Sequence, residues 1–208
     1  MTRLLRAPKK QQARALVMKT RILDAALEVF TKFGFENANL DLVAAQAGCS
    51  RGAIYAHYAS KEEVFLELRD HHLRTQFVDI CTKLEGIPDI EKRRTTFKRW
   101  MIGQIADPFW GTLMLEYKLY AVRHPEAREK LLLHYESFAL QPRSSLIDLL
   151  FGENLSKLAR AAIQRRMAVL GSAFSSLVLE SRFRPDLFPP GKLEPFADEI
   201  FELLVVHN

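Results

Sequence analysis

The chain lacks most features that mark secreted, membrane-embedded or metal-binding proteins. It holds two cysteines in 208 residues, Cys49 and Cys81, and they have no metal-ligand spacing. No run of 18 apolar residues is present, so a membrane span is not expected. The N-terminus also lacks the apolar stretch and cleavage site of a secretory signal. These absences predict a cytoplasmic protein with no disulfide, no metal site and no cofactor.

Catalytic signatures are missing as well. The sequence contains no His-Glu-x-x-His, no glycine-rich phosphate loop and no Gly-x-Ser-x-Gly. The pair His71-His72 lacks the partner four residues away that a helical metal site uses, which favours a solvated pair. An enzyme is therefore not expected.

The pattern of apolar residues predicts an all-α protein of about nine helices, because no segment alternates with a period of two. Composition is that of an ordinary globular protein, with 48% hydrophobic residues. The apolar stripe of a first helix, ended by Gly34, comprises Ile22, Ala25, Ala26, Val29, Phe30 and Phe33. A long helix is expected from Ser60 to about Lys83. Later helices are expected near residues 90–106, 109–123, 125–150 (interrupted or kinked at Pro142), 156–182 and 193–206.

Residues 40–59 have the spacing of two short helices joined by a glycine turn. The first helix has an apolar face of Leu40, Val43, Ala44 and Ala47. Gly48 follows, and only glycine enters the left-handed conformation without steric cost. Ser50 is placed to cap a second helix that runs from Arg51 to about Tyr58 with Ile54 facing inward. Ser60 and Glu63 form a capping box for the next helix. This unit places its second helix in the DNA major groove.

The same segment resembles the DNA-binding end of the TetR family of transcriptional regulators, most closely the branch of multidrug-efflux repressors such as AcrR. The matching residues are Asn39, Val43-Ala44, Ala47-Gly48-Cys49-Ser50, Gly52-Ala53-Ile54-Tyr55, His57-Tyr58 and Lys61-Glu62. Cys49, Ala56 and Tyr58 depart mildly from the family pattern. The resemblance covers about residues 17–77. It implies a basic tail (residues 1–16), a DNA-binding domain (17–77) and a ligand-binding and dimerisation domain (78–208).

Residues of the recognition helix divide by expected role. Arg51 is the best candidate for contacting a base, because its planar fork matches guanine O6 and N7. Gly52 and Ala53 are small enough for a close approach to the groove wall. The resemblance implies phosphate contacts at Tyr55 and Lys61, and His57 is placed for either kind of contact. The complete predicted DNA-binding set is Thr20, Arg21, Asn39, Ser50, Arg51, Gly52, Ala53, Tyr55, His57 and Lys61. The alternative for Arg51 is an exposed charge that touches no base.

Charge is concentrated at the N-terminus. Residues 1–21 contain seven basic and no acidic side chains, whereas the remaining residues carry a formal charge of −2. A basic tail beside a helix-turn-helix suits phosphate neutralisation, and DNA binding should weaken as salt rises. Thr20 and Arg21, expected near the first helix's N-terminal end, are placed to receive a phosphate through free N–H groups. A solvated tail that makes no contact is the alternative.

Residues 97–120 hold six of the chain's 21 aromatic side chains. Flat rings and flexible thioethers make adaptable walls for a hydrophobic or aromatic ligand, which the resemblance implies for this domain. The predicted ligand-binding set is Phe97, Trp100, Met101, Gln104, Trp110, Leu113, Met114, Glu116, Tyr117, Tyr120, His134, Tyr135 and Phe138. The alternative is that these side chains simply fill a helical core.

The last two helices are the predicted homodimer interface, as the resemblance implies. Residues 171–176 are mostly small and permit close helix approach. The predicted dimerisation set is Leu170, Phe174, Leu177, Val178, Ile200, Leu203 and Leu204, and the alternative is an intrachain core.

Together these expectations describe a homodimeric repressor that binds a palindromic operator in double-stranded DNA and is released from it by a small ligand. Ligand entry is expected to shift the helices at 90–106 and 109–123 against the long helix from Ser60. Two rivals remain open: an activator or ligand-independent regulator of the same fold, and a helical enzyme or lipid carrier.

Overall fold

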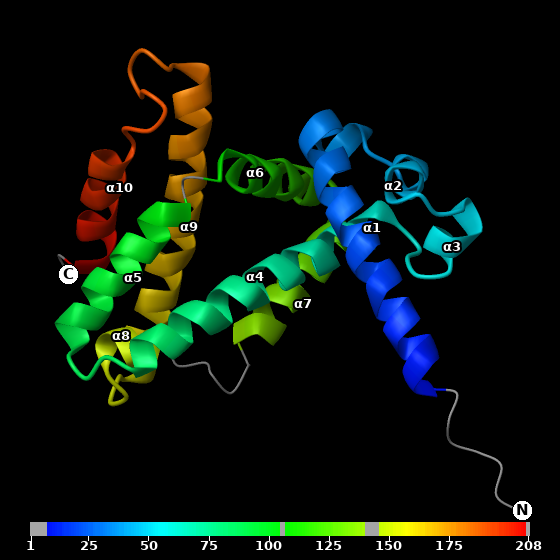
Figure 1. Cartoon of the computed structure of the whole chain (residues 1–208). Coiled ribbons are helices and arrows are strands. Elements are labelled where there is room, and N and C mark those ends of the chain that lie inside the picture. Colours follow the sequence, from blue (N-terminus) through cyan, green and yellow to red (C-terminus); the bar gives the residue numbers. More distant parts are fainter. Residues whose placement is uncertain (1–7, 105–106, 140–145, 207–208) are drawn as a thin grey trace, which may run out of the picture. The chain divides into compact units, whose positions relative to one another are not determined.

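The computed structural model describes residues 8–104, 107–139 and 146–206 of the chain, which divides into two compact units, Met1–His72 and Leu73–Asn208. These described residues form ten α-helices and a final π-helical turn, and they contain no strand (Figure 1). The all-α prediction is confirmed. The unit boundary falls within a helix, five residues before the boundary expected at residue 77.

The N-terminal unit contains α1 (Pro8–Asn37), α2 (Leu40–Ala47), α3 (Arg51–Tyr55) and the first half of α4 (Lys61–Glu85). α2 packs against α1 and α3 packs against α2, as Figure 1 shows. The expected break in the first helix occurs at Gly34, whose φ of 74° is open to glycine at no steric cost. α1 begins at Pro8, so residues 8–16 of the expected tail are helical.

Three phenylalanines form the centre of this unit's core. The ring centroids of Phe30, Phe35 and Phe65 lie 5.4 to 5.9 Å apart, in tilted and edge-on arrangements that aromatic pairs favour. Ile22, Ala25, Ala26 and Val29 of the predicted stripe are buried around them. Phe33 is 39% exposed, so its assignment to the stripe was wrong. Gly34 changes the chain direction after Phe33, and Phe35 takes the inward position instead.

The C-terminal unit is built on α9 (Lys157–Phe183), which packs against α6, α8, α10 and the final turn. One core cluster joins buried side chains from α4, α5 (Ile90–Gln104), α8 (Leu146–Phe151), α9, α10 (Glu194–Phe201) and the turn Glu202–Val206. Its members are Ile80, Leu84, Phe97, Leu150, Leu170, Phe174, Leu177, Leu193, Ala197, Phe201 and Val205.

A second layer of this unit consists of α6 (Pro108–Arg123) and α7 (Pro125–Ala139), with α6 packed on α9. The two backbones approach closely at Gly111, because a Cβ at this position would lie 3.5 Å from Ser175 Cα. The segment predicted as a single helix over 125–150 forms two, α7 and α8. Pro142, the predicted point of interruption, lies outside the described residues.

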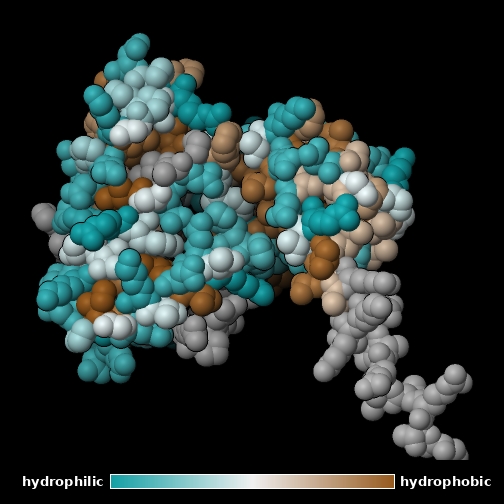
Figure 2. Space-filling view, in the orientation of Figure 1, coloured by the Kyte–Doolittle hydropathy of each residue, from teal (hydrophilic) through white to brown (hydrophobic). Residues whose placement is uncertain are grey.

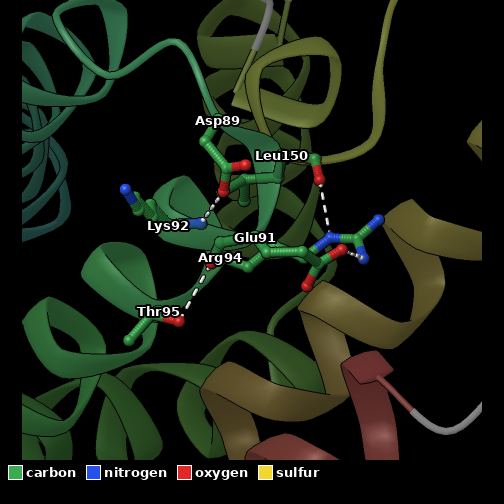
Figure 3. Close-up of polar contacts among 6 residues, drawn as sticks. All are labelled: Asp89, Glu91, Lys92, Arg94, Thr95 and Leu150. Carbon is green, nitrogen blue, oxygen red and sulfur yellow. Dashed lines mark hydrogen bonds and ion pairs between the residues drawn. The ribbon is translucent and has the colours of Figure 1, made fainter.

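Side chains at the start of α5 fix it to the end of α8 (Figure 3). Asp89 Oδ1 accepts a hydrogen bond from Lys92 N at 2.8 Å and caps α5. Arg94 Nε donates to Leu150 O at 2.8 Å, which satisfies a carbonyl at the helix C-terminus. Glu91 Oε1 lies 2.7 Å from Arg94 Nη1 and holds the guanidinium in place.

Among the described helices, none combines the length and apolarity needed to cross a membrane. Hydrophilic side chains cover most of the face seen in Figure 2, with apolar patches between them.

Candidate nucleic-acid interface

The geometry of the turn between α2 and α3 follows the predicted caps. Asn39 Oδ1 accepts from Leu42 N at 2.9 Å at the start of α2, and Gly48 ends this helix with φ 61° and ψ 38°. Ser50 Oγ then accepts from Ala53 N at 3.1 Å and starts α3. Each cap satisfies a backbone donor that has no partner within its helix. Local sequence chemistry therefore sets the direction of α3.

α3 presents a polar outer face and an apolar inner one. Ile54 is fully buried and Tyr58 is 4% exposed, as expected for side chains of the small core. The exposed residues of α3 and of the turn after it are Arg51, Gly52, Tyr55, Ala56 and His57, and Ala53 is half-buried. α3 ends at Tyr55, three residues earlier than predicted, because Ala56 and His57 form a turn. The structure thus brings Arg51, Gly52, Tyr55 and His57 together on one short exposed segment.

Arg51 makes an ion pair with Asp41 of α2, and Nε lies 2.8 Å from Asp41 Oδ1. The Arg51 side chain stays 73% exposed in this pair. Sequence reasoning missed Asp41, because no linear spacing indicates that the first turn of α2 lies beside the first turn of α3.

Thr20 and Arg21 lie well inside α1 rather than at its N-terminal end. Thr20 Oγ1 donates to Leu16 O at 3.2 Å, and Arg21 Nη2 donates to Ala47 O at 2.6 Å. The expectation of free backbone N–H groups at Thr20 and Arg21 is therefore wrong, because the helix continues for 12 residues before Thr20 and uses these donors internally. Their contact with DNA stays a prediction that rests on their side chains.

Lys61 contacts the end of α1. Its Nζ donates to Phe35 O at 2.9 Å and to Glu36 O at 2.6 Å, and it lies 4.8 Å from the centroid of the Phe35 ring. Burial lowers the pKa of the Lys61 ammonium, opposed by the nearby carboxylates of Glu62 and Glu36. A cation at carbonyls of a helix end stabilises that end. A phosphate contact at Lys61 stays a prediction.

Glu67 of α4 joins the buried side of this interface to α1. It forms an ion pair with Lys19, and its carboxylate lies beside the buried Tyr58 hydroxyl. Burial, followed by the polar contact with Glu67 and its negative charge, raises the pKa of Tyr58 above its ordinary value. Tyr58 therefore stays neutral at physiological pH and keeps its hydroxyl proton beside the carboxylate.

The predicted ligand-binding residues fall on two packing faces. Phe97, Trp100 and Met101 belong to the core where α5 meets α8 and α10, and the Phe97 centroid lies 5.5 Å from that of Trp100 and 6.2 Å from that of Phe201. Leu113 and Tyr117 are buried on α6, where α7 and α9 pack. Gln104, Trp110, Met114, Glu116, Tyr120 and His134 are partly exposed. The side chains of Tyr135 and Phe138 lie outside those the structure describes.

The predicted dimerisation residues on α9 are inside their own chain. Leu170, Phe174, Leu177 and Val178 are at most 6% exposed. Their placement on a partner-facing surface is corrected: the core formed with α10 covers Leu170, Phe174 and Leu177, and Val178 is buried within the chain as well. Ile200 and Leu204 pack partly against the same core, and Leu203 is 68% exposed.

Two capped short helices around a left-handed glycine, with an exposed polar face on the second, form a helix-turn-helix, the motif whose second helix enters the DNA major groove in proteins that bind DNA. Residues 22–68 match the family model "Bacterial regulatory proteins, tetR family". The match shows that this part of the chain is similar to the DNA-binding region of TetR-family regulators.

Curated relatives match about a third of the chain. The HTH-type transcriptional regulator TtgW of Pseudomonas putida is 44% identical over 72 residues, which is 33% of this chain and 54% of TtgW. The regulator SrpR of Pseudomonas putida is also 44% identical over 72 residues, or 33% of this chain and 34% of SrpR. The matched region thus spans less than two thirds of either relative.

The fold extends over nearly the whole chain in solved structures. The transcriptional regulator FadR of Bacillus subtilis, solved in complex with stearoyl-CoA, superposes with a TM-score of 0.62 at 19% identity. That match covers 90% of this chain and 97% of FadR. It shows that the C-terminal unit shares the helical fold of such regulators.

Proposed function

We propose that the protein is a homodimeric TetR-type transcriptional repressor that binds a palindromic DNA operator and is released from it by a hydrophobic or aromatic ligand. The exposed face of α3, fixed by the Ser50 cap and the Gly48 turn, is the observation that carries this proposal. In this assignment α3 enters the major groove, as the second helix of a helix-turn-helix does.

Within the interface, we assign Arg51 to contact a base. Tyr55 and His57 are assigned to contact the DNA next to that base. Arg51 is 73% exposed at the first position of α3, so it reaches beyond the helix end. The space beside Gly52 is open, since a Cβ added there would meet only Ser50 Oγ, at 3.9 Å. The wall of the groove can therefore approach the helix closely at this residue. These features favour a short recognition helix whose N-terminal end contacts base edges.

A second copy of the chain is assigned to the outer face of α9. Along this helix, half-buried and exposed side chains recur with alternating spacings of four and three residues, the 3.5-residue repeat of paired helices. We call this row the α9 seam; it comprises Leu158, Ala162, Arg165, Val169, Ser172, Ser176, Leu179 and Phe183. Phe183 is 78% exposed and Leu158 77%, so both ends of the row present apolar side chains to solvent. In this assignment the buried residues of α9 that the sequence predicted for dimerisation pack in the chain's own core, on the side of the helix opposite the seam.

Two α3 helices in such a dimer would have to match half-sites about 34–36 Å apart. α4 supplies Val64 and Phe65 to the N-terminal core and Ile80 and Leu84 to the C-terminal core. In the proposed mechanism, ligand bound among α5 and α6 moves α4, and the two α3 helices leave the operator spacing. Such a coupling is limited by the ligand's preference for one state, typically about 1–3 kcal/mol.

The ligand class includes acyl compounds as well as aromatic ones. A neighbour of similar fold was solved with stearoyl-CoA, a ligand with a long apolar chain. A ligand-independent regulator is the second candidate, and the close packing of Phe97 and Tyr117, at 1% and 0% exposure, favours it.

Selection of bound duplexes from a random pool, followed by footprinting, tests DNA binding by the purified full chain. We expect a palindromic site and affinity that falls steeply with salt. Arg51→Ala should relax preference at one base pair, whereas Tyr55→Phe should weaken all sequences alike. Absence of any sequence preference at low salt contradicts the proposed function.

A thermal-shift screen with stearoyl-CoA, hydrophobic cations and aromatic acids tests the ligand. A compound that raises the melting temperature and releases the selected duplex supports the repressor. A compound that binds without changing DNA affinity contradicts the coupling, and failure of the whole panel to bind favours the ligand-independent candidate.

A further inference from the structure

We propose that Asp41 is a positioning residue that determines the base preference of Arg51. This inference rests on the proposed DNA-binding function and adds a residue from α2 to the recognition surface. The carboxylate acts through the guanidinium and need not touch DNA itself.

The geometry of the ion pair leaves the outer edge of the guanidinium available. Asp41 Oδ1 lies 2.8 Å from Nε, the nitrogen nearest the Arg51 backbone. Bidentate contact with guanine uses two nitrogens of the fork, and the two terminal ones point away from Nε. Among the described residues, Asp41 is the one ion-pair partner of Arg51. The ion pair therefore holds the Nε end of the guanidinium and leaves the two terminal nitrogens available to contact DNA.

Electrostatics give a reason for an acid at this position. Arg51 is the first residue of α3, where the helix dipole disfavours a cation. Asp41 lies in the first turn of α2, where the same effect favours an anion. The Oδ1 atom is shielded from solvent although the Asp41 side chain is 44% exposed, which strengthens its attraction for Arg51. The contact is an ion pair without the alignment of a hydrogen bond, so its strength depends on charge.

Fixing a long side chain before binding reduces the rotamer freedom lost in the complex. It also limits the base pairs that Arg51 can reach. An Arg51 without Asp41 would instead be free to move toward the nearest phosphates, which carry no sequence information. Asp41 therefore lowers total charge attraction to DNA while raising selectivity, and these two effects have opposite signs.

The substitution Asp41→Asn keeps the shape of the side chain and removes its charge. We expect preference at the base pair contacted by Arg51 to fall at least fivefold, within the roughly 5- to 150-fold that a bidentate pair provides. Affinity for unrelated duplexes should rise severalfold at low salt, because one negative charge leaves the interface. Both are measured by fluorescence anisotropy with the selected duplex, its single-base variants and a random-sequence duplex.

Three comparison proteins make the result decisive. Arg51→Ala should lose the same preference, and Asp41→Asn combined with Arg51→Ala should lose no more than Arg51→Ala alone. Asp24→Asn, which removes a charge from an exposed acid of α1, should leave the preference intact. An unchanged preference in Asp41→Asn, or additive losses in the double variant, overturns the assignment.

Measuring stability distinguishes a purely structural role of Asp41 from a positioning role. If Asp41→Asn lowers the melting temperature and weakens every sequence alike, Asp41 only supports the fold and the assignment is overturned. A wild-type protein without sequence preference fails the proposed function itself, which is distinguishable because no variant is needed to observe it.

Discussion

The Arg21 guanidinium donates from Nη2 to the Ala47 carbonyl at 2.6 Å and so ties α1 to the last residue of α2. This carbonyl directly precedes Gly48, the residue that turns the chain toward α3. The end of α2 is thus held against α1 by a side chain 26 residues before Ala47, in addition to the local caps that direct α3.

Replacing Arg21 by Met should loosen this turn while keeping most of the apolar contact of the side chain. The Ala47 carbonyl loses a charge-assisted partner, a change worth about 1 kcal/mol at a partly exposed site. Hydrogen exchange read by mass spectrometry should show faster exchange for the amides of residues 48–54 than in the wild type. Unchanged exchange there would contradict the role given to Arg21.

Gly48→Ala should destabilise the N-terminal unit by about 1–2 kcal/mol, because a non-glycine residue is strained in the left-handed region. The added Cβ would also lie 3.2 Å from Arg21 Nη2, which must shift. Urea unfolding followed by circular dichroism measures the loss. A variant as stable as the wild type would mean that the turn tolerates another conformation.

Gly52→Ala is the matched replacement at the other glycine of this segment, and it should separate folding from DNA binding. A Cβ there meets only Ser50 Oγ at 3.9 Å, and alanine favours a helix over glycine by up to about 1 kcal/mol. Stability should therefore be kept or raised. Affinity for the selected duplex should fall, since the methyl group fills the space proposed for the groove wall; unchanged affinity would argue against close approach.

Val169→Glu should dissociate the proposed dimer without unfolding the chain. Val169 is 54% exposed in the middle of the α9 seam, and two copies would place like charges at its centre. We expect at least a tenfold weaker dimer by analytical ultracentrifugation, equivalent to about 1.4 kcal/mol, and weaker operator binding. Leu132→Glu, at a 51% exposed position of α7, is the control and should stay dimeric. A dimeric Val169→Glu protein would remove α9 as the interface.

Lys98 should stabilise the C-terminal unit in a pH-dependent way. Its Nζ lies 2.7 Å from Glu202 Oε1 and 2.9 Å from Asp198 Oδ1, and hydrogen bonds to these carboxylates raise the pKa of Lys98 above 10.5. The folded state thus holds this proton more tightly than the unfolded state. The contribution of Lys98 to stability is therefore complete below pH 10.5, the ordinary pKa, and disappears as pH rises through the raised pKa of the folded state.

Lys98→Met should therefore lower the free energy of unfolding by about 1 kcal/mol at neutral pH. The difference from wild type should stay constant up to about pH 10 and shrink above it. Urea is the suitable denaturant because guanidinium salts screen charges. Lys192→Met, at an exposed position, should show no such pH dependence; a difference that vanishes already at about pH 8 would contradict the assignment.

The elements at α2 and α3 could be predicted because their signals are local. Asn39, Gly48 and Ser50 act on backbone groups within a few residues of themselves, so their caps and turn follow from spacing alone. The packing partners of exposed polar residues could not be predicted in this way. Lys61 donates to carbonyls 25 and 26 residues away, and Asp41 contacts Arg51 because the turn at Gly48 brings the first turns of α2 and α3 together.

Periodicity could not predict which side of α9 packs in the chain's own core and which side is left for a partner. Leu170, Phe174, Leu177 and Val178 form an apolar stripe that fits either a partner or the chain's own core. The decision depends on α10, which occupies that side of α9. A weaker row of small and apolar residues then remains on the opposite side, and its composition alone gives no strong signal.

The composition of the α9 seam has a consequence for how two subunits would associate. Ala162, Ser172 and Ser176 have few or no rotatable side-chain bonds, so docking them costs little conformational entropy. Association would then depend on how closely two helix backbones fit, more than on the amount of apolar surface covered. Adding a single methylene at one of these positions would hold the two backbones apart at that point and loosen the contacts beside it.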